Sequence, residues 1–154
     1  MKWDKMIHLM NLKKRQAQVR LRWQRDETAA IKSIRNDRVT TARGIAHEIL
    51  VRENTFYSNL TETDRLRIEK HKARIHVMQQ SLETAEKEVK DCDQKIIESE
   101  NKEKQIQLEI IDLQKRVIKW EHLAKEAKND QAIIMDRKEE SLFDDLIMSQ
   151  RRGT

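Results

Sequence analysis

A seven-residue apolar repeat runs through the second half of this 154-residue chain. One row takes every seventh residue from Ile68 to Ala124, and eight of its nine positions are apolar. A second row starts three residues later, at His71, and eight of its ten positions as far as Ile134 are apolar. Such a repeat predicts a left-handed coiled coil in which this segment packs against another helix.

The rest of the composition favours long helices. The chain has no proline and only two glycines, so it has few residues that end a helix. Thr61 and Asp64 have the spacing of a capping box just before the repeat begins. We therefore predict one elongated all-α domain over residues 1–154: a helix over 3–56, a turn over 57–61, and a helix over 62–150. A short connection favours an antiparallel two-helix coiled-coil hairpin with unequal arms, in which the second helix overhangs the first.

Apolar residues in the first half are spaced less regularly, and Gly44 interrupts them at a cost of about 1 kcal/mol for a helix interior. We expect these residues to face the second helix: Leu12, Val19, Trp23, Ala30, Ile34, Ala42, Ile45 and Ile49.

The predicted arms leave part of the repeat without a partner. Folded back from the turn, the first helix would end beside residue 115, yet the repeat continues through Val117 and Trp120 to Ile134. Either the first helix reaches further, or this overhang meets another molecule.

Charge is distributed unevenly. Residues 1–60 hold thirteen basic and six acidic side chains, a net charge of +7, whereas residues 61–154 have a net charge of −2. The basic, amphipathic stretch from Leu12 to Arg25 could bind an acidic protein, nucleic acid or an acidic membrane. Because no clean leucine zipper follows it, we do not expect a DNA-reading module or a nucleic-acid partner.

No constellation for catalysis is evident. The five histidines form no pair four residues apart, Cys92 sits within the repeat, and no glycine-rich phosphate loop exists. A lone hairpin also lacks a cleft that would exclude water. We expect a non-enzyme without cofactor or metal. No apolar run approaches membrane-spanning length and no signal peptide is apparent, so we expect an intracellular, soluble protein without direct membrane insertion.

Three stretches resemble a known family. They are the opening MIHLMNLKKRQAQVRLRW, the segment KWEHLAKEAKNDQ, and the closing RKEESLFDDLIMSQRR, in which Glu140 precedes an acidic pair, Leu146 and two arginines. They are similar to stretches in the stalk proteins of type III secretion, the YscO family of injectisomes and its flagellar relative FliJ. The likeness covers nearly the whole chain except the region around Gly44.

The resemblance implies a non-catalytic stalk that links a hexameric secretion ATPase to the export gate, a membrane protein with a cytoplasmic domain. It would act in the bacterial cytoplasm, at the base of the secretion apparatus, and secretion chaperones are possible further partners. The implied ATPase contacts are Lys13, Lys14, Arg15, Arg20, Arg22, Trp120, Leu123, Leu142, Phe143 and Leu146. The implied gate contacts, which could equally just seal the turn, are Ile49, Phe56, Tyr57 and Leu60.

Two other functions stay open at this point. A generic cytoplasmic coiled-coil adaptor or export chaperone would use the same sequence features without acting on an ATPase. A basic helical nucleic-acid binder would lose its ligand steeply with added salt.

Overall fold

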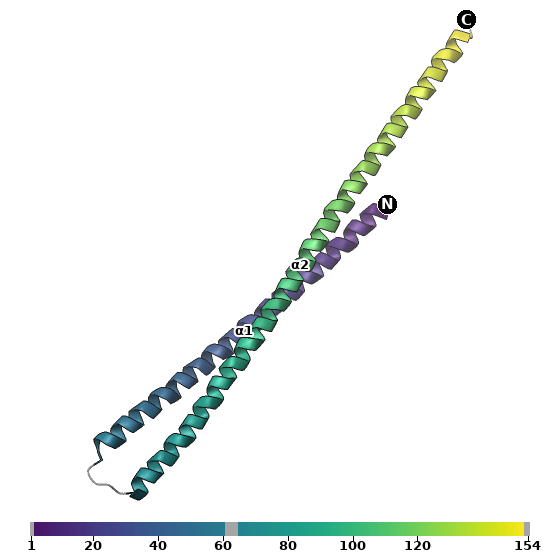
Figure 1. Ribbon diagram of the computed structural model, residues 1–154. Coiled ribbons are helices and arrows are strands. Elements are labelled where there is room, and N and C mark those ends of the chain that lie inside the picture. Colours follow the sequence, from purple (N-terminus) through teal and green to yellow (C-terminus); the bar gives the residue numbers. More distant parts are fainter. Residues whose placement is uncertain (1, 61–64, 153–154) are drawn as a thin grey trace. The chain divides into compact units, whose positions relative to one another are not determined.

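The computed structural model describes residues 2–60 and 65–152, which form two long helices (Figure 1). Helix α1 covers Lys2–Ser58 and helix α2 covers Arg65–Arg152, and the described residues include no strand. The predicted all-α hairpin is therefore confirmed. Helix α1 continues two residues past its predicted end, where the Asn59 amide donates to the Thr55 carbonyl over 3.1 Å. The predicted capping residues Thr61 and Asp64 lie outside the described residues.

The chain divides into two compact parts. One, which we call the terminal part, combines residues 2–20 of α1 with residues 106–152 of α2. The other, the loop-side part, covers residues 21–105. In each part the two helices pack against each other.

The terminal part shows antiparallel pairing through three contacts. Trp3 packs against Trp120 with ring centroids 5.3 Å apart. Lys14 donates to Gln114, and Arg20 pairs with Glu109 at 2.6 Å. Residue numbers thus rise along α1 as they fall along α2. The core between the helices consists of Met10, Ala17, Leu113 and Val117, with Met6, Ile110 and Trp120 packed against it.

The loop-side part has the same antiparallel arrangement with a more polar interface. Gln24 contacts Ser99, Arg35 pairs with Asp93, and the ring of Phe56 stacks on His71. Two further ion pairs cross between the helices, Lys32–Glu100 at 3.3 Å and Arg38–Glu88 at 3.2 Å. Because these side chains are about half exposed, each pair contributes at most about 1 kcal/mol, so packing along the seam provides most of the stability.

The heptad repeat of α2 is the buried face of that helix, as predicted. Every position of the two rows from Ile68 to Ala127 is buried or half-buried. Ile75, Cys92 and Val117 are at most 9% exposed. The repeat stops being a packed seam after Ala127, since Ile134 is 51% exposed.

The predicted face of α1 is wrong over its first half. Leu12, Val19, Trp23, Ala30 and Ile34 are exposed, whereas Ala42, Ile45 and Ile49 are half-buried as expected. The seam of α1 instead follows alternating steps of four and three through Trp3, Ile7, Met10, Lys14, Ala17, Leu21, Gln24, Thr28, Ile31 and Arg35. Polar residues occupy four of these positions. A prediction from apolar residues alone therefore selects the opposite face of the helix.

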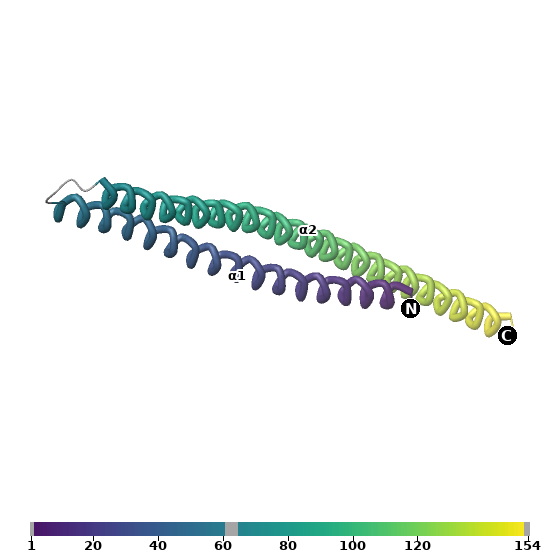
Figure 2. The backbone as a smooth tube through the Cα atoms, turned by 90° about the horizontal axis from the view of Figure 1, so that it is seen from below, coloured from purple at the N-terminus to yellow at the C-terminus, as the bar shows by residue number. Residues whose placement is uncertain are grey.

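The estimated reach of α1 is also wrong. The sequence predicts that α1 ends beside residue 115, but Trp3 contacts Trp120 and Val117 is 3% exposed. The first helix therefore covers the seam further than its predicted length allowed. In both views α2 continues beyond the N-terminal end of α1 (Figure 1, Figure 2). The overhang exists, and it begins after Ala127.

Candidate docking surfaces

The final segment of α2, residues 128–152, has no counterpart in α1, and we call it the overhang. All of its side chains are exposed except that of Ile147, which is half-buried. It carries six acidic and five basic residues, a net charge of −1. Its large exposed apolar side chains are Ile133, Ile134, Met135, Leu142, Phe143, Leu146 and Met148. So many apolar groups on one unpaired helix indicate a binding surface, because exposed patches of this kind seldom persist on isolated proteins.

The residues proposed as ATPase contacts divide between the overhang and the paired helices. Leu142, Phe143 and Leu146 lie in the overhang, each 63% exposed. Trp120 packs on Trp3 in the terminal part, and Leu123 is half-buried. The Trp120 side chain therefore packs within the hairpin.

The basic residues near the N-terminus are partly used within the terminal part. Lys14 Nζ donates to Gln114 Oε1, and Arg20 forms an ion pair with Glu109. Lys13 and Arg15 are exposed. No acidic residue occurs between Asp4 and Asp26 in the sequence, so this stretch presents a positive field to any approaching molecule. In the loop-side part, Arg22 is likewise exposed.

A second apolar face lies on α1, on the side away from its seam. Leu9, Leu12 and Val19 are 42 to 45% exposed, and with the exposed Gln16 they follow steps of three, four and three. We call Leu9, Leu12, Gln16 and Val19 the outer stripe. Sequence reasoning recognised Leu12 and Val19 but assigned them to the core, because a helix with two heptad faces gives no indication of which one is covered.

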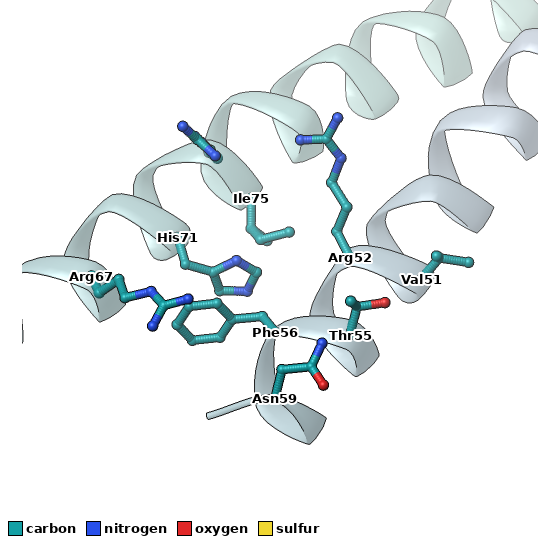
Figure 3. Close-up of a pocket in the computed structure, with 9 residues that line it drawn as sticks. Val51, Arg52, Thr55, Phe56, Asn59, Arg67, His71 and Ile75 are labelled. Carbon is teal, nitrogen blue, oxygen red and sulfur yellow. The ribbon is translucent and has the colours of Figure 1, made fainter. Parts of the chain in front are cut away.

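The loop end of the loop-side part is closed by aromatic stacking (Figure 3). The Phe56 ring lies parallel to the His71 imidazole, with centroids 3.9 Å apart and planes within 2°. Tyr57 meets both rings edge-on, at 5.3 Å from Phe56 and 5.8 Å from His71. Figure 3 shows Phe56 beneath the side chains of Arg67 and His71, at a groove also bordered by Arg52.

This geometry bears on the residues proposed to contact the export gate. Phe56, Ile49 and Leu60 are half-buried, and Phe56 packs within the hairpin end. Tyr57 remains 54% exposed and is the most accessible of the four. Within the described residues, His71 Nε2 is buried and has no hydrogen-bond partner.

A polar layer crosses the helices of the loop-side part. Ser99 and Thr28 are each 4% exposed, and their hydroxyl oxygens lie 2.5 Å apart. The Gln24 amide donates to Ser99 Oγ over 2.7 Å, and the Thr28 hydroxyl donates to the Gln24 carbonyl over 2.9 Å. The Ser99 hydroxyl proton is thus left to bond Thr28 Oγ1, so each of the three side chains has a hydrogen-bond partner. The sequence marked Ser99 as an interruption of the repeat, but Thr28 and Gln24 were missed because nothing in the sequence paired them with it.

Other candidate features are structural. Cys92 is buried in the seam, as predicted for a packing residue. In the part of the chain that the structure describes, no three His, Cys, Asp or Glu side chains are grouped to hold a metal ion. Neither described helix contains a segment that is both long and apolar enough to cross a membrane.

The chain matches no protein-family model, no curated protein and no solved structure.

Proposed function

We propose that this protein is a non-catalytic stalk of a type III secretion export apparatus, linking a hexameric ATPase to the export gate during protein export. In this proposal it acts in the bacterial cytoplasm at the base of the apparatus. The observation that carries the proposal is the overhang, a helix that emerges from a paired hairpin with apolar side chains at Leu142, Phe143 and Leu146 exposed. The resemblance of the two chain ends to the YscO and FliJ stalks supports it.

The overhang would enter the ATPase ring and bury its apolar side chains against the ring's inner surface. Its acidic and basic residues would keep the segment soluble when alone and set its orientation when bound. The exposed basic residues of α1, including Lys13 and Arg15, would meet acidic groups of the ring.

In the loop-side part, the proposed gate contact is centred on Tyr57. It is exposed, whereas Phe56 is held in a stack with His71. A Tyr side chain offers both an apolar ring and a hydroxyl to a partner, which makes it a frequent residue at protein interfaces.

The test is capture of partners from the native host by the full-length chain and by L142D/F143D/L146D. We expect the wild-type chain to retain a hexameric ATPase and to raise its rate of ATP hydrolysis, and the triple variant to lose both effects. A control, L50D/V77D, places acids at two other exposed apolar positions in the loop-side part and should behave like wild type.

Two outcomes of this experiment would contradict the stalk proposal. Retention of a partner without any change in ATP hydrolysis would favour the adaptor or export-chaperone function. Retention of nucleic acid that is released steeply by salt would favour the basic nucleic-acid binder.

A further inference from the structure

The N-terminal segment of α1 has two apolar faces, and the terminal part covers only one. Each outer-stripe residue follows a seam residue by two positions: Leu9 follows Ile7, and Leu12 follows Met10. Two residues correspond to about 200° around an α-helix, so the outer stripe lies directly opposite the seam. A helix with two opposed heptad faces is suited to lie between two other helices.

The overhang carries a stripe with the same spacing. Ala132, Met135, Glu139 and Leu142 follow steps of three, four and three, as do the four outer-stripe residues. The polar member is third in both series, Gln16 in one and Glu139 in the other. Aligned side by side in parallel, the two stripes place apolar residues together and set an amide donor beside a carboxylate.

The charges of the two segments are also complementary. Residues 5–20 contain five Lys or Arg and no acid, a net charge of +5. The overhang has a net charge of −1, and its residues 130–145 hold six acidic and two basic side chains, a net charge of −4. Opposite net charges draw such segments together and suppress pairing of like with like.

The overhang cannot reach the outer stripe of its own chain. Gln114 of α2 lies beside Lys14 of α1, and Glu139 is twenty-five residues further along the same helix. At 1.5 Å per residue this is about 37 Å beyond the stripe. The occupant of the stripe must therefore come from another molecule.

We propose that a second copy of this chain is that occupant, and that the protein forms a two-fold symmetric dimer through its terminal part. The overhang of each copy lies along the outer stripe of the other, with Leu12 beside Met135 and Val19 beside Leu142. Because α1 and α2 are antiparallel within one copy, a two-fold axis perpendicular to the helices presents the partner's overhang parallel to α1, as the matched spacing requires. Each α1 segment then lies between two α2 helices, and the same pair of contacts is made twice.

The dimer covers the apolar side chains of the overhang and the basic face of α1 together. It is independent of the proposed function, since it requires no ATPase. If the chain is also a secretion stalk, dimerisation and docking compete for the same surfaces, and the dimer is the form that must dissociate first.

The first test is sedimentation of the full-length chain over a range of concentrations. We expect a reversible dimer. Both L12E/V19E, on the outer stripe, and M135E/L142E, on the overhang, should raise the dimer dissociation constant by about tenfold or more. L50E/V77E is the matched control, with two exposed apolar residues changed to acids outside both surfaces, and it should dimerise like wild type. Unchanged helical circular dichroism would show that the variants fold.

Mixing the two defective variants tests the pairing itself. One of the two symmetric contacts is intact in the mixed pair, because the normal overhang of one variant meets the normal stripe of the other. A heterodimer should therefore form where neither variant self-associates. A wild-type chain that stays monomeric throughout, or a dimer that neither pair of substitutions weakens, would overturn the proposal.

Disulfide cross-linking tests the register. In a C92S background, Q16C combined with E139C should give a covalent dimer on mild oxidation, because aligned heptad positions bring their Cβ atoms close enough for a disulfide. Q16C combined with R137C moves the second thiol about 200° around the overhang and should not cross-link. Cross-linking through residue 137 but not through residue 139 would refute the assigned face.

Discussion

At the scale of single residues, the polar layer of Gln24, Thr28 and Ser99 sets the alignment of the two helices in the loop-side part. Apolar contacts tolerate sliding by a heptad, whereas the buried Thr28 and Ser99 and the half-buried Gln24 are aligned for hydrogen bonding in only one register. Ser99 interrupts the apolar seam and weakens it, but it also specifies the register in which the two helices pair. The role of Ser99 depends on side chains about seventy residues away in the sequence.

Removing the Ser99 hydroxyl alone should lower the free energy of unfolding more than removing the hydroxyls of Ser99 and Thr28 together. We expect Ser99→Ala to lower the free energy of unfolding by about 1–3 kcal/mol, because it leaves Thr28 buried without one of its partners. The double change Thr28→Val with Ser99→Ala should lose less than the single change, since no buried hydroxyl is left. Urea denaturation followed by circular dichroism measures both. A double variant less stable than Ser99→Ala would show that packing, and not hydrogen bonding, governs the layer.

At the scale of the helices, α1 is continuous although its sequence contains an interior glycine. Gly44 lies in regular helix with no positive φ, and a Cβ added there would meet no atom within 4 Å. The predicted weakness is thus a cost in conformational entropy and not a break in the helix. Helix α1 remains continuous because the free energy gained by packing α1 against α2 exceeds this entropy cost.

Gly44→Ala should stabilise the protein. The substitution restricts the unfolded chain and creates no clash, so we expect the free energy of unfolding to rise by about 0.5–1 kcal/mol. The denaturation midpoint should increase without a change in slope. Gly44→Pro is the opposing control, because it removes an interior helical hydrogen bond and should cost about 3 kcal/mol or more. A destabilising Gly44→Ala would mean that the open space beside this glycine is occupied by a partner.

At the scale of the whole molecule, the packed core of the terminal part and the overhang occupy different segments of α2. The core of the terminal part ends near Val117 and Trp120, whereas the overhang extends to residue 152 with nearly all of its side chains exposed. Charge differs between the same segments, since α1 has a net charge of +7 and the overhang has a net charge of −1.

Deleting the overhang should therefore leave the hairpin intact. For a chain ending at Ala127, we expect an unfolding free energy within about 0.5 kcal/mol of full length at protein concentrations too low for self-association. The same deletion should abolish the dimer and the proposed ATPase capture. A large loss of stability in dilute solution would show that the overhang contributes to the hairpin core. The comparison uses thermal and urea denaturation of both chains.

The sequence by itself determined the all-α hairpin and the buried face of α2. Apolar side chains recur at heptad spacing along the 88 residues of α2, and this spacing predicts which face of the helix is buried. Ile75, Cys92 and Val117 lie on that face. It also located the exposed apolar residues Leu142 and Phe143, because they lie far beyond the reach of any first helix.

Only the tertiary structure decided which face of α1 is covered and how far α1 extends. Lys14 and Arg35 occupy seam positions because their polar ends reach Gln114 and Asp93 at the edge of the interface, and apolar periodicity cannot register such residues. Leu12 and Val19 have an equally good heptad pattern and are nevertheless exposed. A helix with two apolar faces is ambiguous until its neighbours are placed, and that ambiguity is the basis for inferring that α1 has a second partner.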